Sequence, residues 1–371
     1  MRSGDISLLS YIGALVFLNI FLMLFFSIST AQSAEVPPPV KERVGASIED
    51  VHEDFTTPAL TSSNLKPAQP LVFFNDYPHY TVELLRVQWR AVDPIDLYVL
   101  KPKGVKKPPV IIYLYGYPTD TDVFKRTEYQ ELVTRNGVAA VGFVSALTGQ
   151  RYHDRPMKQW FISELQESLA TSAHDVQMVL NYLASRGDLD MDRVGMFTQG
   201  SGASIAILVS GVDPRIKVLE ALDPWADWST WMRSSPLVPE EERQEYLKPE
   251  FLKKVAAMEP VDVLPKIQAK KFRLDDELFD TATPRAIMEK LRSVAPAGAT
   301  VRLYKDMDDF KAAFQDGKNL EWIKKELESV PGATHAARVP DGYSKRFQVG
   351  GEEFLPAQRM LQIVEQQLVL H

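Results

Sequence analysis

The middle of the chain alternates between two patterns of hydrophobic and polar positions. Continuous apolar runs at residues 109–115 and 138–144 are typical of strands buried on both faces of a sheet. A longer segment, roughly residues 158–186, has apolar residues near helical spacing and predicts an amphipathic helix. This alternation of strands and helices predicts parallel pairing with right-handed crossovers, and therefore an α/β fold.

Further strands extend the predicted sheet in both directions. Two of them, 81–89 and 95–100, are joined by the turn residues at 93–94 and predict an antiparallel pair at one edge. Residues 226–268 interrupt the alternation, which predicts a cap inserted between two strands. The remaining strands, which bring the mostly parallel sheet to about eight, are predicted at residues 194–197, 216–222, 270–274 and 300–304.

The start of the chain predicts an export signal or an anchor. Residues 8–28 are almost wholly apolar, and Ser29 and Ala31 after them fit the small-residue rule of a signal-peptidase site. The stretch is also long enough to span a bilayer, so residues 1–34 are either a cleaved signal peptide or a retained N-terminal anchor. Both alternatives predict an exported protein, periplasmic or secreted, that meets the membrane only through this segment.

Composition divides the rest of the chain and excludes several classes of protein. Scattered proline, serine and threonine predict a linker at residues 35–70, followed by the α/β domain at 71–331 and a C-terminal extension at 332–371. The net charge of −7, without a basic stripe, predicts no binding of nucleic acid. The chain has no cysteine, which excludes disulfides, a thiolate nucleophile and a cysteine-bound metal.

A motif in the second half of the chain resembles a known superfamily. Residues 175–203 contain the end of a helix, then Asp190, the sequence RVG at 193–195, a strand and a glycine-rich turn. Together with the turn YLYGYP at 113–118, this order resembles the α/β-hydrolase superfamily, nearest its secreted esterase, dienelactone-hydrolase and prolyl-oligopeptidase-like branch. The resemblance covers about residues 80–310 and implies the α/β-hydrolase fold.

The glycine-rich turn carries the predicted nucleophile. The resemblance implies a serine on a strained turn between a strand and a helix, with a histidine and a carboxylate as partners. Counted from the preceding strand, the serine position falls on Gly200, which has no nucleophile. A shift of one residue places Ser201 at the tip of the turn, with the amides of Tyr117 and Gly202 as the oxyanion hole. The alternative is that Ser201 begins the following helix as its cap.

The carboxylate and the histidine of a triad have weaker signals. Asp280 lies in Asp-Thr-Ala-Thr-Pro, which matches the acid position of the superfamily and also fits a loop cap before a helix. Residues 305–310 stand where the histidine belongs, and none of them is a histidine. Among six histidines, His335 keeps the order serine, aspartate, histidine and completes the predicted triad, while His153 is an alternative; each is otherwise an ordinary surface or structural histidine. No metal-ligand spacing occurs, so neither a metal nor a cofactor is predicted.

Three tryptophans follow the predicted strand at 216–222, at the end that faces the site in this fold. Trp225, Trp228 and Trp231 are predicted to line a pocket for the acyl or aryl part of a small ester or peptide ligand. The alternative is that they anchor the cap to the core.

Two functions are compatible with these residues. The first is a hydrolase of ester or peptide bonds with a non-standard or impaired site that uses Ser201, Asp280 and His335. The second is a catalytically inactive pseudo-hydrolase that binds a ligand or acts as a scaffold in the cell envelope. The position of Ser201, at the tip of the turn or beyond it, distinguishes the two hypotheses.

Overall fold

The computed structural model describes the middle of the chain, namely residues 71–90, 93–117, 121–147, 161–315 and 318–330. The predicted leader at 1–34, the linker at 35–70 and the extension at 332–371 lie outside the described residues. Within the described ranges, no helix is long and apolar enough to cross a membrane.

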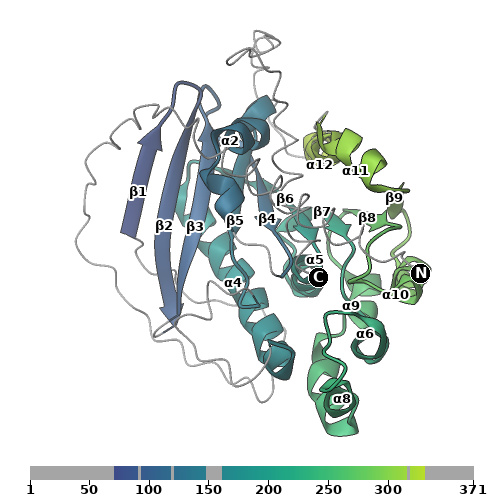
Figure 1. Ribbon diagram of the computed structural model, residues 1–371. Coiled ribbons are helices and arrows are strands. Elements are labelled where there is room, and N and C mark those ends of the chain that lie inside the picture. Colours follow the sequence, from purple (N-terminus) through teal and green to yellow (C-terminus); the bar gives the residue numbers. More distant parts are fainter. Residues whose placement is uncertain (1–70, 91–92, 118–120, 148–160, 316–317, 331–371) are drawn as a thin grey trace, which may run out of the picture. The chain divides into compact units, whose positions relative to one another are not determined.

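One sheet runs through the described residues (Figure 1), and its strands in chain order are β1 (Leu71–Asp76), β2 (Tyr80–Arg90), β3 (Asp93–Pro102), β4 (Pro109–Leu114), β5 (Ala139–Phe143), β6 (Asp190–Gln199), β7 (Ile216–Leu222), β8 (Lys271–Glu277) and β9 (Thr300–Tyr304). Across the sheet, the order is β1-β2-β3-β5-β4-β6-β7-β8-β9. The pairings β1 to β2, β2 to β3 and β3 to β5 are antiparallel, and all the others are parallel.

The mostly parallel α/β architecture with an antiparallel edge is confirmed, with nine strands in place of about eight. The additional strand is β1, which pairs outside β2. Its Phe73 and Phe74 are 39% and 48% exposed, so consecutive large apolar side chains here do not mark a buried strand. The apolar run LVFF in β1 therefore belongs to an exposed edge strand and not to a buried one.

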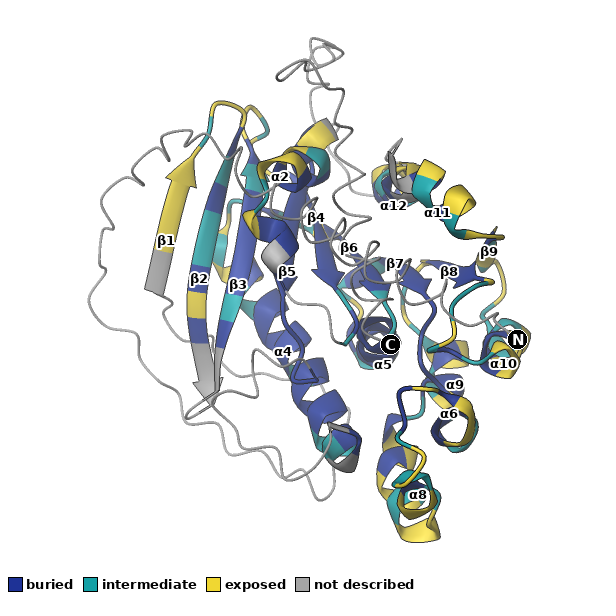
Figure 2. Cartoon of the chain, viewed as in Figure 1, coloured by how far each residue is buried: buried dark blue, intermediate teal, exposed yellow. Residues whose placement is uncertain are grey.

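Helices cover both faces of the sheet, and each face has its own hydrophobic core (Figures 1 and 2). The first face is covered by α4 (Leu165–Arg186), α5 (Ser201–Val212) and α10 (Arg285–Val294). The second is covered by α2 (Thr127–Thr134), α11 (Met307–Gln315) and α12 (Lys318–Ser329). Short 3-10 helices connect these elements at Asp122–Lys125, Arg135–Gly137, Phe161–Glu164, Ala256–Met258 and Leu264–Lys266.

Strand β4 explains why a central strand reads as a continuous apolar run. Val110 and Ile112 point into the first core, whereas Ile111 and Tyr113 point into the second. Because successive side chains of a strand point to opposite faces, both sets must be apolar when helices cover both faces. All six residues of the strand are buried.

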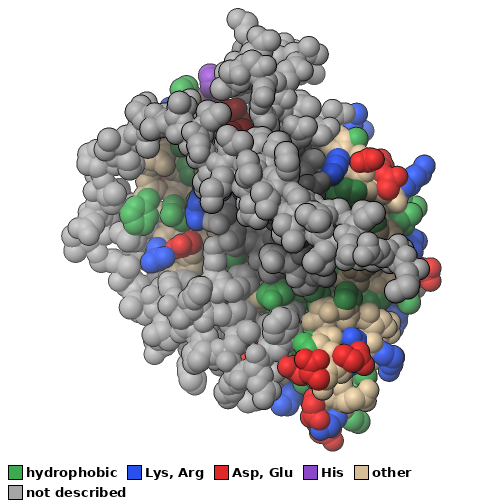
Figure 3. Space-filling view, in the orientation of Figure 1, with side chains coloured by type: hydrophobic (Ala, Val, Ile, Leu, Met, Phe, Trp, Pro, Cys, Tyr) green, Lys and Arg blue, Asp and Glu red, His purple; other side chains and the backbone are tan. Residues whose placement is uncertain are grey.

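Four short helices fill the segment between β7 and β8, namely α6 (Trp228–Ser234), α7 (Arg243–Tyr246), α8 (Pro249–Val255) and α9 (Pro260–Val263). They lie within the residues for which an inserted cap is predicted. The Glu259 carboxylate accepts hydrogen bonds from the amides of Asp227 and Trp228 at 2.8 and 2.9 Å, and from that of Val261 at 3.1 Å. This side chain therefore joins the start of α6 to the start of α9. Acidic and basic side chains lie next to each other over α8 (Figure 3).

Candidate active site

The turn between β6 and α5 is formed by Gly200, which has φ +53° and ψ −123°. Its amide donates to the carbonyl of Leu222 on β7 at 2.9 Å, and its carbonyl accepts from the amides of Ala203 and Ser204 in the first turn of α5. A positive φ of this kind strains any residue with a β-carbon, and glycine adopts it at little cost. Gly200 therefore stands at the tip of the strand-to-helix turn.

Ser201 is the first residue of α5, and its side chain is fully buried. Its Oγ accepts a hydrogen bond from the amide of Tyr117 at 2.9 Å. That amide, which follows β4, is one of the two predicted oxyanion donors. The Ser201 oxygen therefore takes the hydrogen bond that this amide would otherwise donate to an oxyanion.

Two glycines allow the turn after β4 to approach the turn after β6. A β-carbon on Gly116 would lie 2.8 Å from the carbonyl oxygen of Gln199, and one on Gly202 would lie 2.2 Å from the carbonyl oxygen of Leu114. Neither position accepts a larger residue without movement of the backbone. In this fold the residue after the tip donates its amide to the oxyanion. With Gly200 at the tip, that residue is Ser201 and not Gly202, for which the role was predicted.

The three tryptophans form a buried cluster, called here the tryptophan stack. The rings of Trp225 and Trp231 are stacked at 4.7 Å, and Trp228 meets Trp231 edge-on at 6.0 Å. The indole N–H groups of Trp228 and Trp231 donate to the carbonyls of Met258 and Ala282 at 2.7 and 3.0 Å. These bonds fit the alternative prediction that tryptophans anchor the cap.

Trp225 also faces the turn. Its Nε1 lies 3.5 Å from the point where a β-carbon on Gly200 would stand. Its exposed fraction is 2%. A ring at this place covers the tip of the turn, so of the three predicted pocket residues Trp225 lies closest to the position of a nucleophile.

Asp280, the predicted acid, shapes its own loop. Its carboxylate accepts hydrogen bonds from the amides of Ala282 and Thr283 at 3.1 and 2.8 Å. The loop then leads through Pro284 into α10. Such hydrogen bonds are typical of a loop cap, which was the alternative role predicted for Asp280.

Two further buried acids lie beside Asp280, and the sequence analysis missed them. The Asp223 carboxylate, after β7, accepts from the amide of Glu277 at the end of β8, with Oδ1 and Oδ2 at 3.1 and 3.3 Å. We call Asp223, Glu277 and Asp280 the acid cluster. The run Asp275-Asp276-Glu277, which directly follows Leu274 at the end of a strand, is a signal that points to buried acids here.

Burial raises the pKa of each member of the acid cluster. It raises the pKa of Glu277 to about 8, with a further contribution from Asp280. The pKa of Asp223 is raised well above its ordinary value by burial and by Glu277. Burial also raises the pKa of Asp280, against the amides that stabilise its charged form. Burial therefore favours the protonated form throughout the cluster, and Glu277, with a pKa of about 8, keeps its proton at neutral pH.

The loop after β9, where the superfamily has its histidine, begins α11 instead. Asp309 accepts from the amide of Lys305 at 3.2 Å and donates its own amide to Asp306 at 2.9 Å. These exposed carboxylates satisfy amides at the start of the helix. His335 and His153 lie outside the described residues. Among the residues that are described, no group of three His, Asp or Glu side chains could hold a metal ion.

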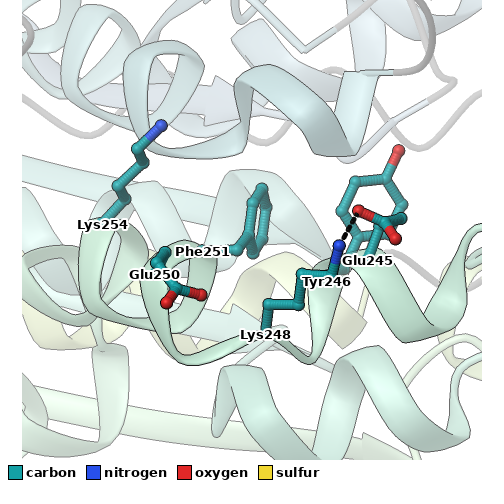
Figure 4. Close-up of a pocket in the computed structure, with 6 residues that line it drawn as sticks. All are labelled: Glu245, Tyr246, Lys248, Glu250, Phe251 and Lys254. Carbon is teal, nitrogen blue, oxygen red and sulfur yellow. Dashed lines mark hydrogen bonds and ion pairs between the residues drawn. The ribbon is translucent and has the colours of Figure 1, made fainter.

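A separate shallow pocket of about 250 Å³ lies on the cap (Figure 4), and it is lined by Glu245, Tyr246, Lys248, Glu250, Phe251 and Lys254. Lys248 forms an ion pair with Glu245 at 2.6 Å across its rim. None of the predicted site residues lines it. The pocket is open to solvent and belongs to α7, α8 and the residues between them.

The sheet order, the helices on both faces and the glycine turn from β6 into α5 together define the α/β-hydrolase fold, which this chain adopts. The acetyl xylan esterase from Paenibacillus sp. R4 is similar to it with a TM-score of 0.56 and 18% identity, over 70% of this chain and 89% of the esterase. The S-formylglutathione hydrolase from Agrobacterium tumefaciens is similar with a TM-score of 0.51 and 15% identity, over 71% of this chain and 100% of the hydrolase.

A third similar structure is acetyl xylan esterase 1 from Thermoanaerobacterium sp. JW/SL YS485, with a TM-score of 0.50 and 14% identity, over 68% of this chain and 89% of the esterase. No protein-family model and no curated protein matches the chain. At these identities the likeness is one of fold, and the chemistry must be argued from the site itself.

Proposed function

We propose that this chain is a pseudo-hydrolase, an α/β-hydrolase fold that binds a small ester-like or peptide-like ligand at its turn without cleaving it by the usual serine mechanism. The observation that carries the proposal is Gly200 at the tip of the turn, with φ +53°. In a serine hydrolase of this fold, that tip presents the nucleophilic hydroxyl to the substrate. A glycine there leaves the substrate carbonyl with no hydroxyl to attack it.

The arrangement of Ser201 supports the same proposal. Its hydroxyl oxygen accepts from the Tyr117 amide, at 2.9 Å, and so fills an oxyanion position. A serine hydroxyl also needs a neighbouring base to become nucleophilic near neutral pH. The members of the acid cluster are carboxyl groups, and burial raises the pKa of Asp223 and Glu277.

A second candidate is a hydrolase of ester or peptide bonds that uses Ser201. The observation in its favour is that Ser201 directly follows the tip residue, and its Oγ contacts the amide of Tyr117, a predicted oxyanion donor. Asp280 would orient a histidine, with His335 or His153 in that role. The names of the similar structures, esterase and hydrolase, add support at the level of fold.

The site of action that we propose is outside the cytoplasm. The apolar run at residues 8–28, followed by small residues, supports export to the periplasm or beyond, either as a cleaved protein or on an anchor. A binding or scaffold role in the envelope is consistent with that location.

Active-site labelling tests the choice between the two candidates. We expect no reaction of the wild-type chain with a fluorophosphonate probe and no turnover of p-nitrophenyl acetate or butyrate above buffer. Ser201→Ala would then behave as wild type, and so would the matched control Ser293→Ala, which removes an exposed hydroxyl on α10. Labelling that disappears in Ser201→Ala and persists in Ser293→Ala would overturn the pseudo-hydrolase proposal in favour of the second candidate.

Ligand binding tests the positive part of the proposal. We expect calorimetry to detect binding of the uncleavable amide butyranilide, and Trp225→Phe to weaken it by about threefold to tenfold through the loss of ring contact. Trp322→Phe on α12 is the control, because that ring contacts Arg273 on the second face of the sheet. Equal weakening by both variants would argue against a site at the turn.

A further inference from the structure

The loop at residues 278–283 physically links the acid cluster to the cap. Asp280 holds the amide of Ala282 at 3.1 Å. The carbonyl of Ala282 in turn accepts from Trp231 Nε1 at 3.0 Å and from Ser235 Oγ at 2.8 Å. The end of α6 is therefore fixed to the loop that Asp280 shapes.

The same loop is connected to the tip of the turn through stacked rings. Trp231, held by Ala282, stacks on Trp225 at 4.7 Å. Trp225 in turn covers Gly200, with its Nε1 3.5 Å from the position of a β-carbon there. A displacement of the loop would consequently release the ring that covers the tip.

One oxygen of the acid cluster is buried without a hydrogen-bond partner in the part of the chain that the structure describes. Glu277 is 9% exposed, and its Oε1 has no hydrogen-bond partner among the described residues. The carbonyl of Asp223 accepts from the Thr283 hydroxyl at 2.9 Å, which ties the loop to the cluster a second time. Asp223 also has φ +44°, so the cluster is held in a strained backbone conformation.

The cations nearest the cluster are bound to other carboxylates. Arg285 pairs with Asp276 at 2.8 Å, and Arg292 pairs with the same group. Arg273 pairs with Glu220 and Asp275. The charged and titratable groups around the cluster, from all elements packed against it, are thus Glu220, Arg273, Asp275, Asp276, Arg285, Arg292, Arg302 and Tyr304.

We propose that Asp223, Glu277 and Asp280 act as a proton-dependent latch on the ligand site: the protonated cluster holds the 278–283 loop and the tryptophan stack closed over Gly200, and loss of a proton opens them. The inference rests on the proposed function, because the site that the latch controls is the proposed ligand site. The physical reason is that ionisation places like charges together in a buried site whose nearby cations are already paired. Movement of the loop brings water to these charges and separates them.

Hydrogen–deuterium exchange of the full chain tests the latch without any ligand. The measured quantity is the equilibrium constant for opening of residues 228–234 and 278–283, after correction for the intrinsic pH dependence of exchange. We expect this constant to rise by up to about tenfold for each pH unit. The rise should level off above about pH 8, where Glu277 is ionised in the closed state as well. Exchange in β4 should show no such rise.

Variants decide whether the cluster causes the opening. Glu277→Gln, which keeps the shape of the protonated side chain, should hold both segments closed at all pH values. The control Glu289→Gln, at an exposed position on α10, should behave as wild type. Asp280→Asn removes a neighbouring charge and should shift the rise to lower pH, which provides a second test if Glu277→Gln does not fold.

The outcomes separate this inference from the proposed function. Opening that is independent of pH in the wild type, or a Glu277→Gln variant that opens as the wild type does, overturns the latch whatever ligand binds. A pH-dependent opening that Glu277→Gln abolishes supports the latch even if butyranilide does not bind. In that second case, the proposed ligand site fails by itself.

Discussion

At the scale of single residues, Glu277 has a measurable effect on stability. Burial and Asp280 raise its pKa to about 8 from an ordinary 4.5. The folded protein therefore keeps a proton that the unfolded chain releases, so the stability contributed by this group is complete below about pH 4.5 and is lost as the pH rises to about 8. We expect Glu277→Gln to remove this loss and to exceed the wild type at about pH 8, by on the order of a few kcal/mol.

Urea unfolding at about pH 5, 6.5 and 8 measures this difference. Glu289→Gln, at the exposed position on α10, should leave the pH dependence of the wild type unchanged. A wild-type free energy of unfolding that increases over this range would contradict the argument, because it would mean that Glu277 is ionised in the folded state.

At the scale of secondary-structure elements, the contact between α5 and the end of β4 positions the site. A β-carbon on Gly202 would lie 2.2 Å from the carbonyl oxygen of Leu114, which is backbone and cannot rotate away. We expect Gly202→Ala to reduce the free energy of unfolding by about 1–3 kcal/mol through overpacking. It should also disturb the hydrogen bond between Tyr117 and Ser201.

Gly211→Ala is the matched control, because it makes the same substitution near the other end of α5. The added β-carbon there would meet only side-chain atoms, Cγ1 and Cβ of Val263 at 2.5 and 3.9 Å, and no backbone atom. Alanine also has the higher helix propensity, by about 1 kcal/mol. Thermal unfolding should therefore show a smaller loss for Gly211→Ala, and an equal loss in both variants would contradict the role of the Leu114 contact.

The same elements show how far the sequence predicts the structure. Strands β4 and β5 and residues 194–197 of β6 are predictable because they are buried on both faces and therefore apolar. Strand β1 was not predicted, because its apolar run of four residues, LVFF, is short and directly follows the predicted linker, and it forms an exposed edge strand. Counting from the strand identifies Gly200 as the tip, since the turn from β6 into α5 depends on neighbouring residues alone.

Local patterns reveal few contacts between distant residues. The resemblance placed the Tyr117 amide near Ser201, 84 positions along the chain, whereas nothing linked Glu277 to Asp223, which are 54 positions apart. Local patterns carry no information about such pairs, so the acid cluster was missed and the anchoring bonds of the tryptophan stack could be stated only as an alternative. The roles of Asp280 and His335 as members of a triad stay predictions.

At the scale of the whole described domain, two cores on opposite faces share one sheet, and Arg273 on β8 forms a charged cluster on the second face. It pairs with Glu220 on β7 and with Asp275 at 3.0 Å, and its guanidinium lies 4.7 Å from the ring centroid of Trp322 on α12. Glu220 is fully buried. Burial and the neighbouring Asp275 raise its pKa well above the ordinary value, and Arg273 opposes that rise by stabilising the charged form.

Removal of this arginine should therefore cost more than the loss of one ion pair. Arg273→Met leaves Glu220 buried without a cation, and we expect a loss of about 3–5 kcal/mol in the free energy of unfolding, largest at high pH where Glu220 cannot be neutralised by a proton. The double variant Arg273→Met/Glu220→Gln should recover part of the loss, because the uncompensated charge is gone. Urea unfolding of both variants at about pH 6 and 8 measures the coupling. If the single variant lost less than about 1 kcal/mol, as an exposed pair would, Glu220 would not depend on Arg273 in the folded protein, and the argument for the buried ion pair would fail.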